Sequence, residues 1–309
     1  MMKILITLLV LATAIAVVLI LRHRLCSTTG SGESPMVQSF AAPNIESLAD
    51  VDVANVPYES TSIELEGVVS PRSQGGWPGK DEKFEVHSFE LAAWRIPGQP
   101  IMERDLLLLR PVRLHAKYFS DYPAYTVHRM KVLLSEDHTR AVLEKPLPLT
   151  KADDQLVAIA GELQKPVVIN TKSFGKLVLD RKLDWFEGKA RWQGRQIIVR
   201  FPTEDRKSIA GSALETAETI WKDQAKWELK VNNLIIAELL SLKNSNWRDD
   251  NEATLTEEAF IKRITLESAK FDTNGKFEFW YADGELFLGH AIEVLGNLKD
   301  GPTSAGISG

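Results

Sequence analysis

The chain has 309 residues, of which 44% are apolar and 26% charged, a composition typical of a globular protein long enough for about two domains. Its formal net charge is only -5, and no long basic run follows the N-terminal segment, so we predict no nucleic-acid partner. The single cysteine, Cys26, excludes an intrachain disulfide and a cysteine-rich zinc site.

The chain begins with a candidate membrane anchor. Residues 4–21, ILITLLVLATAIAVVLIL, are uncharged and apolar, and as a helix rising about 1.5 Å per residue they would just span a bilayer core. The following RHRLC offers no small-residue cleavage site, which favours a retained anchor over a signal peptide. Arg22 and Arg24 follow the run and only Lys3 precedes it, so the positive-inside rule predicts a cytoplasmic body.

Composition and periodicity divide the remainder into a tether and two folded regions. We expect the fold class to be α+β. The predicted order is a membrane anchor over residues 1–26, a flexible tether over 27–60, a small β-barrel or sandwich over 61–150, a connecting helix capped by Thr150 over 151–165, and an α+β domain with antiparallel hairpins and helices over 166–309.

The C-terminal strands allow a register to be predicted. A loop of Thr273, Asn274 and Gly275 would place Phe271 on the apolar face and pair Lys270 with Glu278. Further on, Asp283-Gly284 is a strong signal for a two-residue hairpin turn. That turn would set Tyr281 opposite Leu286 and Phe277 opposite His290, on the same apolar face.

His290 could be either a catalytic residue or a structural residue of the core. The only carboxylate expected on its face is Glu267, which the same register places opposite Tyr281 and Leu286, too far along the strands for a hydrogen bond. We therefore interpret His290 as a structural, half-buried residue. If the protein is an enzyme, His290 and Glu267 are the candidate catalytic residues.

The opposite face of these strands is the candidate binding surface. It is expected to carry Trp280 beside Phe287, an aromatic platform if no helix covers it and ordinary core if one does. Trp247, flanked by polar residues, and Asp283 are further candidates for binding. The histidines lack a zinc-binding spacing, and no nucleophile elbow, dinucleotide-binding loop or EF-hand occurs, so we predict no metal, no cofactor and no catalytic residues.

Three stretches carry a resemblance: FGKLVLDRKLDWFEGKARW, ELLSLKNSNW and NGKFEFWYADGELFLGHAIEVLG. From residue 173 to 309 the chain resembles the bacterial family known as domain of unknown function 2262, and residues 64–169 resemble the β-rich region that often precedes it. The resemblance implies no assigned reaction and no catalytic residues. Relatives tend to be acidic near the end, where this chain has Ser304 and Gly306.

These observations predict a non-catalytic recognition protein, such as an immunity-like protein, with an unidentified protein partner. It would be anchored through residues 4–21 as a single-pass protein of the bacterial inner membrane, with a cytoplasmic body. The alternatives are a hydrolase that uses carboxylates and His290, or a structural protein of the envelope.

Overall fold

The structure is a computed structural model that describes residues 57–72, 74–78, 84–113, 121–248 and 252–309. The predicted anchor at residues 4–21 and most of the predicted tether lie outside these ranges. None of the helices that the structure describes is both long and apolar enough to cross a membrane.

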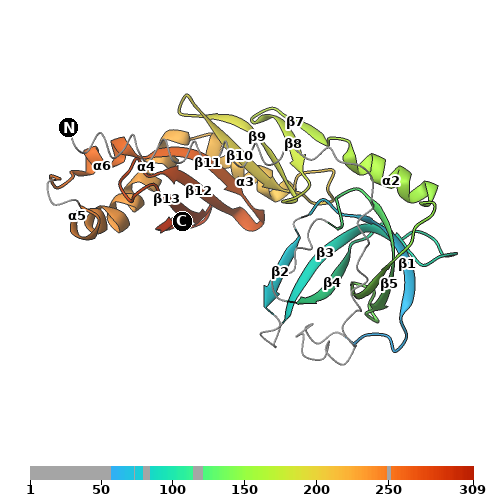
Figure 1. Ribbon diagram of the computed structural model, residues 1–309. Coiled ribbons are helices and arrows are strands. Elements are labelled where there is room, and N and C mark those ends of the chain that lie inside the picture. Colours follow the sequence, from blue (N-terminus) through green and yellow to red (C-terminus); the bar gives the residue numbers. More distant parts are fainter. Residues whose placement is uncertain (1–56, 73, 79–83, 114–120, 249–251) are drawn as a thin grey trace, which may run out of the picture. The chain divides into compact units, whose positions relative to one another are not determined.

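The first folded region is a five-stranded barrel (Figure 1). Its ring runs β1–β5–β6–β4–β3 and closes where β3 pairs with β1; β4 and β6 run parallel and the other ring pairs antiparallel. This strand order is that of the Greek-key barrel called the OB-fold. The strands are β1 (Ile63–Val69), β3 (Phe84–Arg95), β4 (Leu106–Arg113), β5 (Val127–Leu134) and β6 (Arg140–Leu147), with the short β2 (Gly75–Pro78) added beside β3.

Alternating apolar residues fill the barrel. Leu65, Trp94 and Met130 are all 0% exposed in one cluster, as expected for inward-facing positions of a small barrel. Helix α2 (Asp154–Gln164) then lays Leu156 and Ala160 against the outside of β1 and β3. The predicted cap Thr150 is wrong: the carboxylate of Asp153 accepts the hydrogen bonds that begin this helix.

The second folded region is an eight-stranded sheet in the order β14-β13-β12-β11-β10-β9-β8-β7. All neighbours are antiparallel except β10 and β11, and the crossover between those two carries helices α3 to α6. The strands are β7 (Val168–Thr171), β8 (Gly175–Asp180), β9 (Trp185–Trp192), β10 (Arg195–Pro202), β11 (Thr265–Phe271), β12 (Lys276–Ala282), β13 (Ala291–Asn297) and β14 (Gly301–Ser308).

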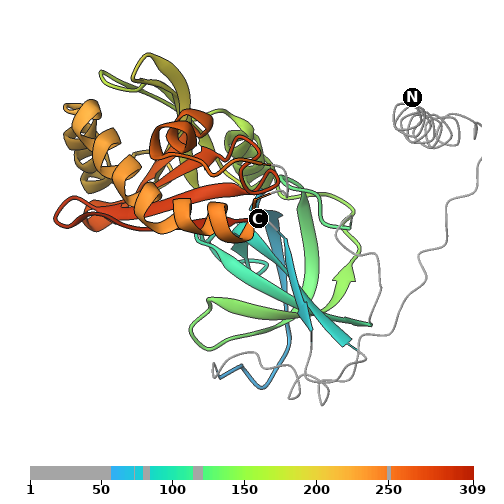
Figure 2. The same cartoon turned by 90° about the vertical axis from the view of Figure 1, so that its left-hand side faces the viewer.

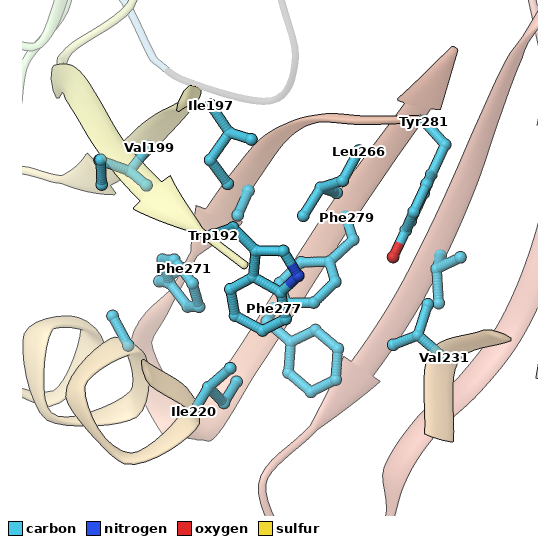
Figure 3. Close-up of a cluster of buried hydrophobic side chains, with 14 of the residues drawn as sticks. Trp192, Ile197, Val199, Ile220, Val231, Leu266, Phe271, Phe277, Phe279 and Tyr281 are labelled. Carbon is cyan, nitrogen blue, oxygen red and sulfur yellow. The ribbon is translucent and has the colours of Figure 1, made fainter. Parts of the chain in front are cut away.

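Helices cover one face of this sheet (Figure 2). They are α3 (Gly211–Trp221), α4 (Gln224–Ile235), which continues through the π-helical turn Ile236–Leu240 into α5 (Ser241–Asn246), and α6 (Glu257–Arg263). Between the two layers lies an aromatic core that includes Trp192, Phe271, Phe277 and Phe279, each at most 2% exposed (Figure 3). Edge-to-face contacts link these rings, such as Trp192 with Phe279 at 5.4 Å between centroids.

The predicted α+β class is wrong. Strand residues outnumber helix residues in the described chain, and the protein is mostly β. The helical signals in the sequence were real, but apart from α2 the α-helices that the structure describes fall within a single crossover between β10 and β11. Strands make up both the barrel and the full width of the second sheet, so the helices form a cover rather than an equal layer.

The predicted register of β11 and β12 is confirmed next to their turn, from Ala269 to Phe271, but it is wrong beyond the bulge at Glu267, where Leu266 and not Glu267 lies opposite Tyr281. Phe271 lies opposite Phe277, and Lys270 lies opposite Glu278 with 3.0 Å between Nζ and Oε1. The short 3-10 turn Thr273–Gly275 connects the strands, with left-handed backbone at Asn274 (φ 61°) and Gly275 (φ 76°). Asparagine and glycine are the residues that tolerate this conformation best.

Two arginines connect the barrel with the second sheet. Arg72 pairs with Asp105 and Asp184, and Arg206 pairs with the same two aspartates. The described residues from 57 to 309 all fall within one compact unit by their contacts. The division into folded regions at 61–150 and 166–309 stays a prediction.

Candidate functional site

The long loop between β12 and β13, residues 283–290, gathers most of the residues singled out from the sequence. The predicted two-residue turn at Asp283-Gly284 is wrong, because β12 ends at Ala282 and pairs there with Ala291, the first residue of β13. Tyr281 therefore lies opposite Ile292 and not Leu286, and Phe277 lies opposite Gly296 and not His290.

Asp283 organises this loop from within. The residue is only 4% exposed, and its carboxylate accepts hydrogen bonds from three backbone amides, those of Glu285 (3.1 Å), Phe287 (2.6 Å) and Gly289 (3.2 Å). Hydrogen bonds to a carboxylate are stronger than neutral ones and satisfy donors that a chain reversal would otherwise leave unpaired. The expected binding residue is thus the structural centre of the loop.

A network of charged side chains supports the loop from outside. Arg263, at the end of α6, donates to the carbonyl oxygen of Gly284 at 2.7 Å and pairs with Glu252. Glu252 also pairs at 2.6 Å with Lys243, which is 3% exposed and donates to the carbonyl of Trp247. The sequence analysis missed Lys243 and Arg263. The partners of Lys243 are a backbone carbonyl at the end of its own helix and Glu252, and Arg263 reaches a carbonyl 21 residues along the chain, so neither residue leaves a recognisable pattern in the sequence.

Phe287 enters the core and does not join Trp280 in a platform. Its side chain is 0% exposed and contacts Trp247 edge-to-face at 5.6 Å, while Phe260 lies at 6.2 Å. Trp280 is half-buried in β12 between the fully buried Phe279 and Tyr281, so it points to the other face of the sheet. The expected Trp280/Phe287 platform is therefore absent, whereas Phe287 and Trp247 do come together.

His290 is held by the loop itself. Its Nδ1 lies 2.6 Å from the carbonyl oxygen of Phe287 and donates to it, which leaves Nε2 as an acceptor in the neutral ring. The half-buried ring also meets Trp247 edge-to-face at 5.8 Å. Among the described residues the imidazole has no acidic hydrogen-bond partner.

Glu267, the other candidate for chemistry, lies elsewhere. The pairing of β11 with β12 skips it, with Leu266 opposite Tyr281 and Ser268 opposite Trp280, so Glu267 is bulged out of the ladder. Its side chain is exposed, not on the apolar face where the sequence placed it. The structure therefore does not bring His290 and Glu267 together, and over the described ranges no three His, Cys, Asp or Glu side chains gather as a metal site.

Leu288 is the one large apolar side chain of the loop that faces solvent. It is 77% exposed, the most of the exposed large hydrophobic residues in the described chain, and its backbone is left-handed with φ 59°. A leucine in this conformation costs about 1–2 kcal/mol relative to the right-handed regions. A rigid, internally bonded loop therefore presents an apolar side chain at an energetic cost.

The second region is thus a helix-covered, mostly antiparallel sheet whose β12–β13 loop is a rigid projection with an apolar tip. Residues 171–307, which contain nearly all of that sheet, match the family DUF2262, described as "Uncharacterized protein conserved in bacteria". The match confirms the resemblance seen in the C-terminal part of the sequence. Searches of curated proteins and of solved structures gave no match.

Proposed function

We propose that the protein is a recognition protein that binds another protein through the loop of residues 283–290, with Leu288 as its central contact. The observation that carries the proposal is the combination of rigidity and exposure. Asp283, Arg263 and His290 fix the loop by hydrogen bonds, yet Leu288 is left in solvent in a costly backbone conformation. Such strain is retained where it serves a function.

Preorganisation supports the same proposal. A loop already fixed in its bound form pays little conformational entropy on association. Burying a leucine side chain in a partner's apolar pocket contributes about 1.5–3 kcal/mol, enough for one residue to dominate a small interface. The commitment of the His290 Nδ1 and the Asp283 carboxylate to backbone groups fits a role in shaping this surface rather than in chemistry.

Photo-crosslinking in the native bacterial membrane fraction tests the proposal. A photoreactive residue at position 288 should give one discrete crosslinked protein. The same residue at position 229, whose leucine is 62% exposed on α4, is the matched control and should not. Leu288→Ala should weaken the isolated complex by about ten- to a hundredfold. Equal crosslinking from both positions, or an unchanged affinity, would contradict the proposal.

Membrane attachment is a separate part of the proposal and rests on the hydropathy of residues 4–21. The full chain should stay in the membrane pellet after carbonate extraction, and removal of residues 1–26 should release it. Protease added to spheroplasts should spare the body if it is cytoplasmic, as Arg22 and Arg24 predict. Digestion of the body beside an intact cytoplasmic control would reverse the proposed orientation and support an envelope role.

A further inference from the structure

A cavity of about 290 Å³ lies between the second sheet and its helical cover, away from the loop described above. Trp192 and Tyr281 contribute to its inner wall, and residues of α4 and α6 form its sides. Both residues line the cavity, and Figure 3 shows the indole of Trp192 and the phenol of Tyr281 to either side of Phe279. The volume is near the lower end of that found for small-molecule sites.

Both of these polar groups lack a partner. Trp192 is 2% exposed and Tyr281 4% exposed, and neither the indole Nε1 nor the phenol oxygen has a hydrogen bond to any described residue. Buried polar groups in folded proteins are nearly always paired, so each such orphan calls for an explanation. Burial, reinforced by the charge of Glu228, raises the pKa of Tyr281, so the phenol remains a neutral O–H donor at ordinary pH.

The orientation of these groups is fixed by the core behind them. The indole of Trp192 packs edge-to-face against Trp221 and Phe279, at 5.1 Å and 5.4 Å between centroids. Tyr281 is held in β12 between the partners Leu266 and Ile292 of the neighbouring strands. The two donors are therefore preorganised and do not turn away to find partners elsewhere.

The rest of the lining adds further polar groups that are not paired with one another. Glu228 and Asn232, half-buried on α4, and the exposed Arg195 and Lys262 all line the cavity. Over the described part of the chain, none of these four side chains makes an ion pair or hydrogen bond. A ligand here would meet two fixed donors, a carboxylate and an amide inside, and two cations toward the solvent.

We infer that this cavity binds a small polyhydroxylated anion, such as a sugar acid or a sugar phosphate. A hydroxyl group can accept a hydrogen bond from the Trp192 N–H and at the same time donate one to Glu228 or Asn232. A group that only donates or only accepts cannot make both of these hydrogen bonds. Glu228 disfavours a second carboxylate deep inside, while Arg195 and Lys262 favour an anionic group at the exposed side. The site shares no residue with the proposed protein-binding loop and is independent of that proposal.

Calorimetric titration of the full-length protein tests the ligand class. Glucuronate and glucose 6-phosphate are the two anionic probes. Glucose, which lacks the anionic group, and inorganic phosphate, which lacks the sugar, are the controls. At least one anionic sugar should bind, glucose about tenfold more weakly, and phosphate alone not measurably. The stronger of the two anionic sugars identifies the preferred charged group. Equal binding of phosphate alone, or no binding by either anionic sugar, overturns the inference.

Tyr281→Phe separates a ligand site from a cavity that only holds water. Loss of the hydroxyl should weaken binding of the anionic sugar about tenfold, and it should leave the melting temperature of the ligand-free protein unchanged or raised, because the group has no protein partner to lose. Tyr58→Phe is the control, since the Tyr58 hydroxyl is also buried without a partner but lies outside the cavity. Equal affinity in the Tyr281→Phe and native proteins shows that the sugar does not contact the Tyr281 hydroxyl and refutes the site.

Discussion

The two connections that flank β12 make an instructive pair. The Thr273–Gly275 turn has the conformation and register that its sequence predicts, whereas the loop of residues 283–290 does not form the turn that Asp283-Gly284 signals. In the first connection the local preferences of Asn274 and Gly275 agree with the pairing of β11 and β12. In the second, Asp283 binds backbone amides further along the chain and Phe287 is drawn into the core. Local turn chemistry therefore decides a conformation only where no tertiary contact competes with it.

The largest expected change in stability comes from removing the tertiary contact of Phe287. Phe287→Ala should destabilise the protein by about 3–5 kcal/mol, because Phe287 is fully buried against Trp247 and Phe260. Trp280→Ala, on the other face of the sheet, should cost clearly less. Denaturant unfolding followed by tryptophan fluorescence, with Phe287→Leu as a conservative control, measures the difference. A loss below about 1 kcal/mol for Phe287→Ala would mean that the side chain is exposed, as in the platform alternative.

A second test compares the two aspartates. Asp283→Ala should cost about 2–4 kcal/mol, because three backbone amides lose a carboxylate acceptor and at least one is buried. Asp272→Ala should cost under about 1 kcal/mol, since among the described residues that carboxylate accepts only from the amide and hydroxyl of Thr273, at an exposed turn. Asp283→Asn, which keeps one carbonyl oxygen, should fall between them. Equal losses for both alanine variants would remove the proposed difference between turn and loop.

A third test exchanges the residues at the left-handed positions. Asn274→Leu should destabilise by about 1–2 kcal/mol, since leucine is disfavoured at φ 61°. Leu288→Asn should stabilise by about 0.5–1 kcal/mol, because asparagine tolerates this conformation and the leucine makes little contact at 77% exposure. Thermal unfolding of both variants gives the two signs. Destabilisation by Leu288→Asn would show that Leu288 has a packing role in the free protein.

The smallest effect concerns the ion pair that follows from the confirmed register. Lys270 and Glu278 lie opposite each other with side chains 31% and 29% exposed, so their coupling should be about 0.3–1 kcal/mol. A double-mutant cycle with Lys270→Met and Glu278→Gln measures it, and salt should reduce it. If the coupling free energy is zero at low salt, the ion pair does not stabilise this register, and the packing of the apolar face alone determines it.

These elements show which features of the fold and of the candidate site can be predicted from the sequence. Period-two patterns revealed the strands, and turn residues gave the β11–β12 register down to the partner of Lys270. The predicted fold class was wrong because the helix signals of the second region were counted as a layer, whereas α3 to α6 all lie in the one crossover between β10 and β11. The candidate residues Phe287, Trp247 and His290 do meet, through direct ring contacts and the hydrogen bond within the loop, while the ion pairs of Glu252 with Arg263 and Lys243 connect α6 and α5 behind them. Such distant pairs leave no periodic trace.

The connection between β10 and β11 also bears on how fast the protein folds. Strands β7 to β10 and β11 to β14 are each a run of antiparallel neighbours close in sequence, and only the parallel β10–β11 pairing joins the two halves across the whole helical segment. Closing so long a connection costs entropy before its contacts are gained, which makes pairing of this kind slow. Each half should therefore gain structure early, and the joining of Val199 to Ala269 should belong to the rate-limiting step. Substitutions at that seam will slow folding, whereas those at the outer strands will chiefly speed unfolding.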